Sequence, residues 1–194
     1  MEKDIRVERT QTALRNAFCE MLASKPAYGI SVTNLTKKAG VSRVTFYIHY
    51  KDIADFIEKT CDWALEEMIW PPASEMNIFN IDNAKLIFTK QAEAISKNAG
   101  LFRALFGNNG PNYFLEKIVN VIEAEYHIQF RKMKDKFKSK QQIQDTVKYL
   151  TAGELAILID WIHQDHMESI DAVVEKIMIL SYKGVLTSLG LIDD

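Results

Sequence analysis

Apolar residues recur at intervals of three and four along almost the whole chain, and this periodicity restricts the fold more than any other feature. In the first part of the sequence the spacing predicts an amphipathic helix over about residues 5–24. The same pattern predicts further helices over about residues 53–69, 82–97, 112–130, 141–163 and 169–189. No segment shows the sustained alternation of a strand bounded by hairpin signals. The sequence therefore predicts an all-α protein.

The composition and the chain ends indicate an ordinary globular protein of the cytoplasm. Of the 194 residues, 47% are apolar and 26% are charged. The two cysteines lie in apolar helical patterns without a neighbouring partner, so no disulfide framework is predicted. The longest apolar run, Leu155 to Ile159, is far shorter than the roughly 20 residues of a membrane span. The N-terminus lacks the pattern of a secretory signal, and we expect a cytoplasmic location without a membrane partner.

The most informative stretch runs from residue 30 to residue 51. Ser31 is suited to cap a short helix, and Gly40 supplies the permissive backbone where that helix ends in a tight turn. Ser42 is suited to cap a second short helix that runs to about Tyr50. Two helices of about two turns each, joined by a turn that contains glycine, form the helix-turn-helix plan.

The second of these helices has two different faces. Rotation by 100° per residue places Tyr50 beside Phe46, so these two side chains are expected to pack. The opposite half carries Val44, Thr45, Tyr47 and Ile48, an unusual set for a helix that faces only water. Such a surface suits the thymine methyl groups and base edges of a DNA major groove, while hydroxyls and cations hold phosphates.

These residues resemble the DNA-binding domain of the TetR (tetracycline repressor) family of bacterial transcription regulators. The shared marks are the amphipathic first helix, Ser-Val-x-x-Leu at 31–35, Ala-Gly-Val-Ser-Arg at 39–43 and Thr-Phe-Tyr-x-His-Tyr-Lys at 45–51. The resemblance implies an N-terminal three-helix helix-turn-helix domain at 1–51, a connecting helix at 52–70 and a helical effector-binding and dimerisation domain at 71–194. It also implies a homodimer that binds double-stranded operator DNA and responds to a small-molecule effector. Whether such a protein represses or activates depends on the position of its operator.

Carried over position by position, the family pattern implies DNA contacts from ten residues. They are Ser31, Thr33, Ser42, Arg43, Val44, Thr45, Tyr47, Ile48, His49 and Lys51. Two positions depart from the pattern, because Val44 stands where many members have a small residue and Ile53 where many have a basic one. Three of these residues also have an alternative role. Tyr47 can pack between helices, His49 can be a charge partner at a helix end, and Arg43 can be a solvated cation.

The C-terminal two thirds carry weaker signals for a dimer interface and a pocket. The residues expected at a dimer interface, in a bundle of the last two helices, are Leu158, Trp161, Ile162, Val173, Ile177, Leu180 and Gly184. The aromatic residues expected at a ligand pocket are Phe102, Phe106, Tyr113, Phe114, Tyr126 and Tyr149, with ordinary core packing as the alternative. The Tyr-x3-Gly-x7-Trp spacing at 149–161 resembles the TetR subgroup that includes dihydroxyacetone-kinase regulators.

Other function classes receive less support. His163 and His166 have i, i+3 spacing with Asp160 and Asp165 nearby, but a third ligand is lacking, and no metal and no cofactor are expected. The sequence has no nucleophile elbow, phosphate-binding glycine loop or His-Glu-x-x-His pair, so we expect no enzyme. The alternatives are a protein-interaction module whose helix-turn-helix has lost DNA affinity and, with less support, a small-molecule enzyme.

The net charge of −2 conceals an asymmetry along the chain. Residues 1–50 contain eight cations and four acids, a net charge of +4, whereas residues 51–194 contain 16 cations and 22 acids, a net charge of −6. A uniformly basic nucleic-acid-binding protein is therefore excluded. The asymmetry still allows a basic N-terminal part that binds phosphates and is present twice in a dimer.

Overall fold

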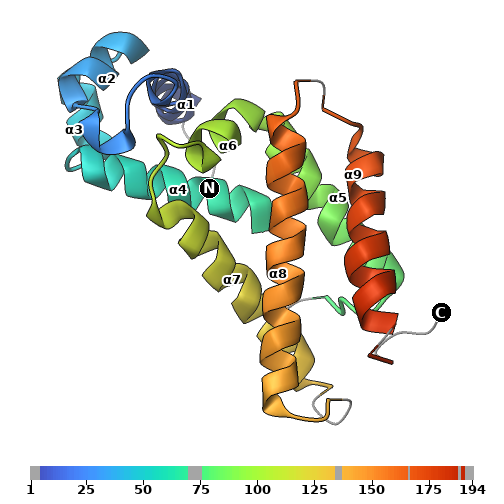
Figure 1. Cartoon of the computed structure of the whole chain (residues 1–194). Helices are drawn as coiled ribbons and strands as arrows, with labels where there is room; N and C mark the ends of the chain where they lie inside the picture. The colour runs from blue at the N-terminus through green and yellow to red at the C-terminus, as the bar shows by residue number, and fades with distance from the viewer. Residues whose placement is uncertain (1–4, 70–75, 134–136, 166, 188, 191–194) are drawn as a thin grey trace. The chain divides into compact units, whose positions relative to one another are not determined.

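A computed structural model of the chain describes residues 5–69, 76–133, 137–165, 167–187 and 189–190, and in this portion the chain is helical without a strand (Figure 1). The all-α prediction is confirmed. The α-helices are α1 (Ile5–Leu22), α2 (Val32–Ala39), α3 (Arg43–His49), α4 (Ile53–Ile69), α5 (Ile81–Lys97), α6 (Ala99–Phe106), α7 (Tyr113–Arg131), α8 (Lys140–His163) and α9 (Ile170–Ile177). The described residues also include a 3₁₀ turn at Ala27–Gly29 and a π-helical segment, Met178–Leu186.

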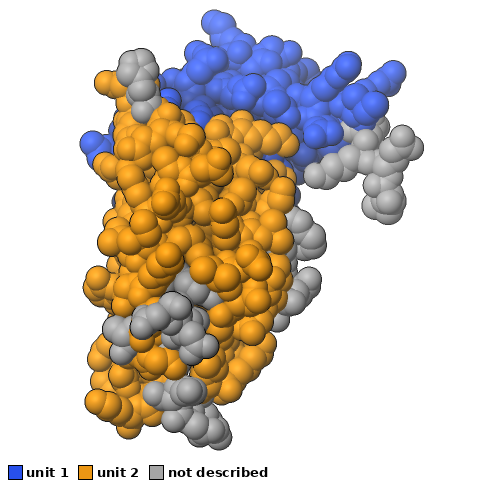
Figure 2. Space-filling model, turned by 90° about the vertical axis from the view of Figure 1, so that its right-hand side faces the viewer, with its two compact units in different colours: residues 1–64, 99–114 blue, residues 65–98, 115–194 orange. Residues whose placement is uncertain are grey.

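The chain divides into two compact units (Figure 2). Unit 1 contains residues 1–64 and 99–114, and unit 2 contains residues 65–98 and 115–194. The divisions therefore fall inside α4, between α5 and α6, and inside α7. These units differ from the sequence-based ranges, because α6 and the loop after it belong with the helix-turn-helix. The expected boundary at Pro71 and Pro72 lies outside the described residues.

Unit 1 is built around a cluster of aromatic rings. Phe18 of α1, Phe46 of α3 and Phe56 of α4 are fully buried, and Tyr50 is nearly so. The ring centroids lie 5.4 Å apart for Phe18 and Phe56, and 5.0 Å apart for Tyr50 and Phe56. Aromatic burial of this kind dominates the packing energy of a small core. Helix α1 also packs against α2 and α6, and α2 packs against α3.

The loop after α6 is tied to the end of α1. The side-chain amide of Asn109 donates a hydrogen bond of 2.9 Å to the carbonyl oxygen of Leu22, and the Ala27 N–H donates to the Asn109 carbonyl oxygen at 2.9 Å. These bonds satisfy backbone groups that would otherwise be left open where α1 ends. Gly110 is required in this loop, since a Cβ there would lie 2.1 Å from the Leu105 carbonyl oxygen.

Unit 2 is held by α5, α8, α9 and the π-helical segment. Helix α5 packs against α9 and α8, and α8 packs against both α9 and the segment that follows it. The indole N–H of Trp161 donates to the Glu168 carbonyl oxygen at 2.9 Å, which fixes the turn between α8 and α9. The sequence predicts one helix over about 169–189, whereas the structure changes from α to π geometry at Met178. No helix among the described residues is long and apolar enough to cross a membrane.

Candidate DNA-recognition helix and ligand cavity

The turn between α2 and α3 is fixed by local hydrogen bonds that the sequence encodes. The Ser31 hydroxyl accepts from the Asn34 N–H at 3.3 Å and the Ser42 hydroxyl from the Thr45 N–H at 3.0 Å, so both predicted caps are confirmed. Gly40 has a φ of 65°, and the N–H groups of Gly40 and Val41 donate to the carbonyl oxygens of Lys37 and Thr36. This pattern is a Schellman motif, and its left-handed residue favours glycine.

Helix α3 has one buried and one open face, as its sequence predicts. Phe46 and Tyr50 are buried in the aromatic core of unit 1. On the other side Val44, Tyr47 and Ile48 are 74%, 50% and 72% exposed. Three large apolar or aromatic side chains in water on a helix of seven residues are unusual for a surface without a partner.

The other residues expected to contact DNA lie at the surface of the same two helices and at their ends. Ser31, Thr33, Ser42, Arg43 and Lys51 are exposed, while Thr45 and His49 are partly exposed. The hydroxyls of Ser42 and Thr45 lie 2.8 Å apart. Because Ser31 and Ser42 also cap helices, their hydroxyl oxygens have a structural role even without DNA.

The C-terminal end of α3 is held in place by the ion pair between Asp55 and Lys59 of α4. The Lys59 ammonium donates to the His49 carbonyl oxygen at 3.3 Å and to Asp55 Oδ2 at 2.9 Å. The same Asp55 oxygen accepts from the Lys51 N–H at 2.9 Å. The hydrogen bond from the Lys51 backbone, followed by that from Lys59, holds the pKa of Asp55 below its ordinary value. Asp55 and Lys59 are not among the site residues predicted from the sequence, although their i, i+4 spacing is a visible signal.

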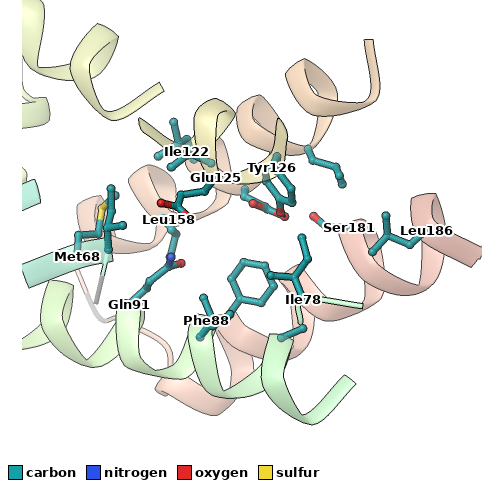
Figure 3. Close-up of a pocket in the computed structure, with 16 residues that line it drawn as sticks. Met68, Ile78, Phe88, Gln91, Ile122, Glu125, Tyr126, Leu158, Ser181 and Leu186 are labelled. Carbon is teal, nitrogen blue, oxygen red and sulfur yellow. The ribbon is translucent and has the colours of Figure 1, made fainter. Parts of the chain in front are cut away.

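A cavity of about 60 Å³ lies inside unit 2 (Figure 3). On the same measure a single water needs roughly 10–15 Å³, so the space is large enough for a small molecule. Its walls come from the end of α4, from Ile78, and from α5, α7, α8 and the π-helical segment. Most of the lining is apolar, and the polar exceptions are Gln91, Glu125, Tyr126, Glu154 and Ser181.

Of the six aromatic residues expected at a pocket, Tyr126 lines this cavity. Phe102, Phe106 and Phe114 belong to unit 1, where the Phe106 and Phe114 ring centroids lie 5.2 Å apart. Tyr113 also belongs to unit 1, and burial raises the pKa of its hydroxyl. Tyr149 is exposed on α8. The aromatic residues of α6 and the start of α7 therefore pack with the helix-turn-helix unit.

The most unusual group in the cavity is a buried acid, Glu154, which is not among the pocket residues predicted from the sequence. Glu154 of α8 is 4% exposed, and its Oε1 accepts a hydrogen bond of 2.5 Å from the Tyr126 hydroxyl. Ser181 is a second hydrogen-bond partner. Burial raises the pKa of Glu154 to about 7, and the bonds from Tyr126 and Ser181 oppose that shift. The signal in the sequence is an acid on the apolar stripe formed by Leu150, Leu158 and Trp161.

The residues expected at a dimer interface fall into two groups. Leu158, Trp161, Ile162, Val173 and Ile177 are buried within the single chain, whereas Leu180 is 59% exposed and Gly184 is also exposed. No group of three potential metal ligands occurs among the residues for which the structure gives a position. His163 bonds to the Ile159 carbonyl oxygen at 2.8 Å, and His166 lies outside the described residues.

Comparison with known proteins places this architecture in a family of regulators. A TetR-family model, described as a transcriptional regulator C-terminal region, matches residues 82–183, just over half of the chain. The chain therefore belongs to the TetR family of transcriptional regulators. It is 33% identical over 128 residues to the uncharacterised HTH-type transcriptional regulator YxbF of Bacillus subtilis (strain 168), which covers 63% of this chain. The chain matches about a third of the length of that curated relative, 33%.

Solved structures of regulators share the fold at low sequence identity. The dihydroxyacetone kinase operon activator DhaS has a TM-score of 0.62 and 16% identity, with 95% of this chain and 98% of that chain covered. A TetR transcriptional regulator from Streptococcus agalactiae 2603V has a TM-score of 0.61 and 18% identity, covering 92% and 97%. FadR from Bacillus subtilis, in complex with stearoyl-CoA, has a TM-score of 0.56 and 18% identity, covering 90% and 98%.

Proposed function

We propose that this TetR-family regulator is a homodimer that binds operator DNA through α3, with an affinity that a small molecule in the unit 2 cavity changes. Membership of the family supports a role in transcription. The DNA-binding part rests on one observation, the open face of α3. Val44, Tyr47 and Ile48 are held out to solvent by a helix whose rear face is locked in an aromatic core. A rigid helix that presents such side chains is suited to the major groove.

The ten residues for which the family pattern implies DNA contact fall into two groups with different proposed roles. Val44, Tyr47 and Ile48 face the bases, because they form the apolar open face of α3. The hydroxyls of Ser31, Thr33, Ser42 and Thr45, with Arg43, His49 and Lys51, flank that face and hold phosphates. Phosphate contacts position the helix, and base contacts give it sequence preference.

The proposed dimer interface uses the side chains that remain exposed on α8 and after α9. The exposed residues proposed for this interface are Leu180 and Gly184 of the π-helical segment and Tyr149 and Gly153 of α8. The five predicted interface residues that are buried within one chain lie beneath this surface. In a two-fold dimer, two α3 helices about 34–36 Å apart would enter successive major grooves of a pseudo-palindromic operator.

Effector control is proposed to act through α4. This helix carries Phe56 in the core of unit 1, and its last residues, Met68 and Ile69, line the cavity of unit 2. A ligand that displaces Met68 therefore acts on a helix that continues into the DNA-binding unit. FadR, which shares the fold, is in complex with stearoyl-CoA, and this supports a ligand role for the helical part. The ligand weakens DNA binding only if it prefers the non-binding conformation.

The test is a salt series on the DNA upstream of the gene and on a random-operator library. The affinity of the wild-type protein should fall steeply as the salt concentration rises, because binding releases counterions from phosphates. Tyr47→Ala should weaken specific binding by roughly 1–3 kcal/mol. Tyr28→Ala is the matched control, since Tyr28 is also an exposed tyrosine of unit 1 but lies outside α2 and α3. Absence of binding to both DNAs, or equal effects of the two variants, would contradict the proposal.

A further inference from the structure

The cavity of unit 2 contains two acids and no basic side chain among the lining residues that the structure describes. Glu154 is buried and bonded to the Tyr126 hydroxyl, and Ser181 is its second partner. Glu125, which precedes Tyr126 on α7, also lines the cavity and is partly exposed. In Figure 3 Tyr126 from α7 and Ser181 from the π-helical segment are directed toward the same point of the cavity.

Both known partners of Glu154 are neutral hydroxyls. Hydrogen bonds from neutral donors stabilise an ionised carboxylate, but they do not replace the water that burial removes. The pKa of about 7 for this group is the expression of that deficit. A cation that enters the cavity would supply the missing stabilisation, whereas an anion would meet two carboxyl groups in an apolar surrounding.

The remainder of the cavity accepts an apolar body. Ile87 and Phe88 of α5 and Leu155 and Leu158 of α8 contribute hydrocarbon walls. Gln91 adds an amide that is neutral in charge. A ligand that fits the apolar part of this wall would place a polar group next to Glu154, the buried acid among the lining residues.

We propose that the cavity binds an amphipathic cation, a small apolar molecule whose protonated amine lies against the Glu154 carboxylate. This inference rests on the proposed effector site and names its ligand class. It sets an order of affinity among ligands of one shape: amine first, alcohol second, carboxylate last. Substitution of the acid should change that order, and loss of either hydroxyl partner should not.

The experiment titrates the full-length protein by calorimetry, without DNA, with hexylamine, hexan-1-ol and hexanoate at pH 8. The wild-type protein should bind hexylamine most tightly and hexanoate least tightly. Glu154→Gln should weaken hexylamine binding about tenfold or more, because the buried charge partner is gone, and should leave hexanol unchanged. Ser181→Ala should keep the preference for the amine, since the carboxylate remains.

Glu93→Gln is the control, because Glu93 is an exposed acid of α5 paired with Lys90. It should not change any of the three affinities. Equal binding of hexylamine and hexanol, tighter binding of hexanoate, an unchanged amine affinity in Glu154→Gln, or no amine binding would each overturn the proposal. Circular dichroism of Glu154→Gln checks that this variant is folded. Operator binding without ligand is measured separately, so a failure of ligand recognition is distinguished from a failure of the DNA-binding proposal.

Discussion

At the scale of single residues, Glu154 connects the stability of the chain with the proposed ligand cavity. It occupies a core position on α8 where an apolar residue would pack without an electrostatic cost. The sequence places an acid there, and the fold surrounds it with the hydroxyls of Tyr126 and Ser181. An ionisable group retained in such a place is a frequent property of functional sites.

The raised pKa of Glu154 predicts a pH-dependent stability. Its pKa rises from 4.5 to about 7 on folding, so the folded chain holds this proton more tightly than the unfolded chain. The contribution is fully present below pH 4.5 and is lost as the pH rises through about 7. Relative to Glu154→Gln, the wild-type free energy of unfolding should fall by at most about 3 kcal/mol between pH 4.5 and pH 8. Urea unfolding of both proteins measures this difference, and parallel pH profiles would contradict it.

Gly110 gives a second prediction at this scale. In Gly110→Ala the new methyl group would meet the Leu105 carbonyl oxygen at 2.1 Å, so the loop that carries Asn109 must shift. We expect a loss of about 2–3 kcal/mol in the free energy of unfolding. Gly100→Ala is the control, because a Cβ at Gly100 has no neighbour within 4 Å. That variant should be neutral or more stable by up to about 1 kcal/mol, since alanine favours a helix over glycine. Equal losses in both variants would show that the close contact is not the cause.

At the scale of elements, short helices acquire a fixed position from their ends. Helix α3 has seven residues, which is too short to be stable by itself. The Ser42 cap fixes its start, and the Asp55 and Lys59 pair on α4 fixes its end. The π-helical segment shows a related effect, because i to i+5 bonding places Ser181 and Leu186 on the same side, toward the cavity.

Loss of the Asp55–Lys59 ion pair at the end of α3 should weaken DNA binding without removal of a phosphate contact. Lys59→Met keeps the apolar stem but removes the bonds to His49 and Asp55. Because this ion pair is partly open to solvent, its loss should lower operator affinity by about fivefold at most. The slope of log affinity against log salt should stay unchanged, whereas Lys51→Met should reduce its magnitude by about one.

Lys90→Met tests whether loss of any surface lysine has this effect. Lys90 forms a similar exposed pair with Glu93 in unit 2. Its replacement should leave operator affinity within experimental error. A reduced salt slope in Lys59→Met would instead show that Lys59 itself contacts phosphate.

At the scale of the whole molecule, the sequence predicts what depends on near neighbours. The caps at Ser31 and Ser42, the glycine turn at Gly40 and the two faces of α3 depend on residues within four or five positions, and the structure confirms them. Helix α6 belongs to unit 1 through packing against α1, far earlier in the chain, and the loop after it is bonded to Leu22 by Asn109. Phe102 and Phe114 are buried and Phe106 is partly buried, but helical periodicity does not show which core they join. For that reason the lining of the cavity was harder to predict than the two faces of α3.

The proposed assembly makes the last prediction. Leu180 is 59% exposed on the π-helical segment, where burial against a second copy would remove its apolar surface from water. Leu180→Arg places a charge in that surface, so the wild-type protein should sediment at twice the 22.2 kDa chain mass and the variant at the mass of one chain. Leu86→Arg is the control, since Leu86 is 45% exposed on α5 and should leave the dimer intact. The monomeric variant should lose its high affinity for the full operator, because only one half-site can be held at a time. A wild-type monomer, or a Leu180→Arg dimer, would show that this surface does not form the interface.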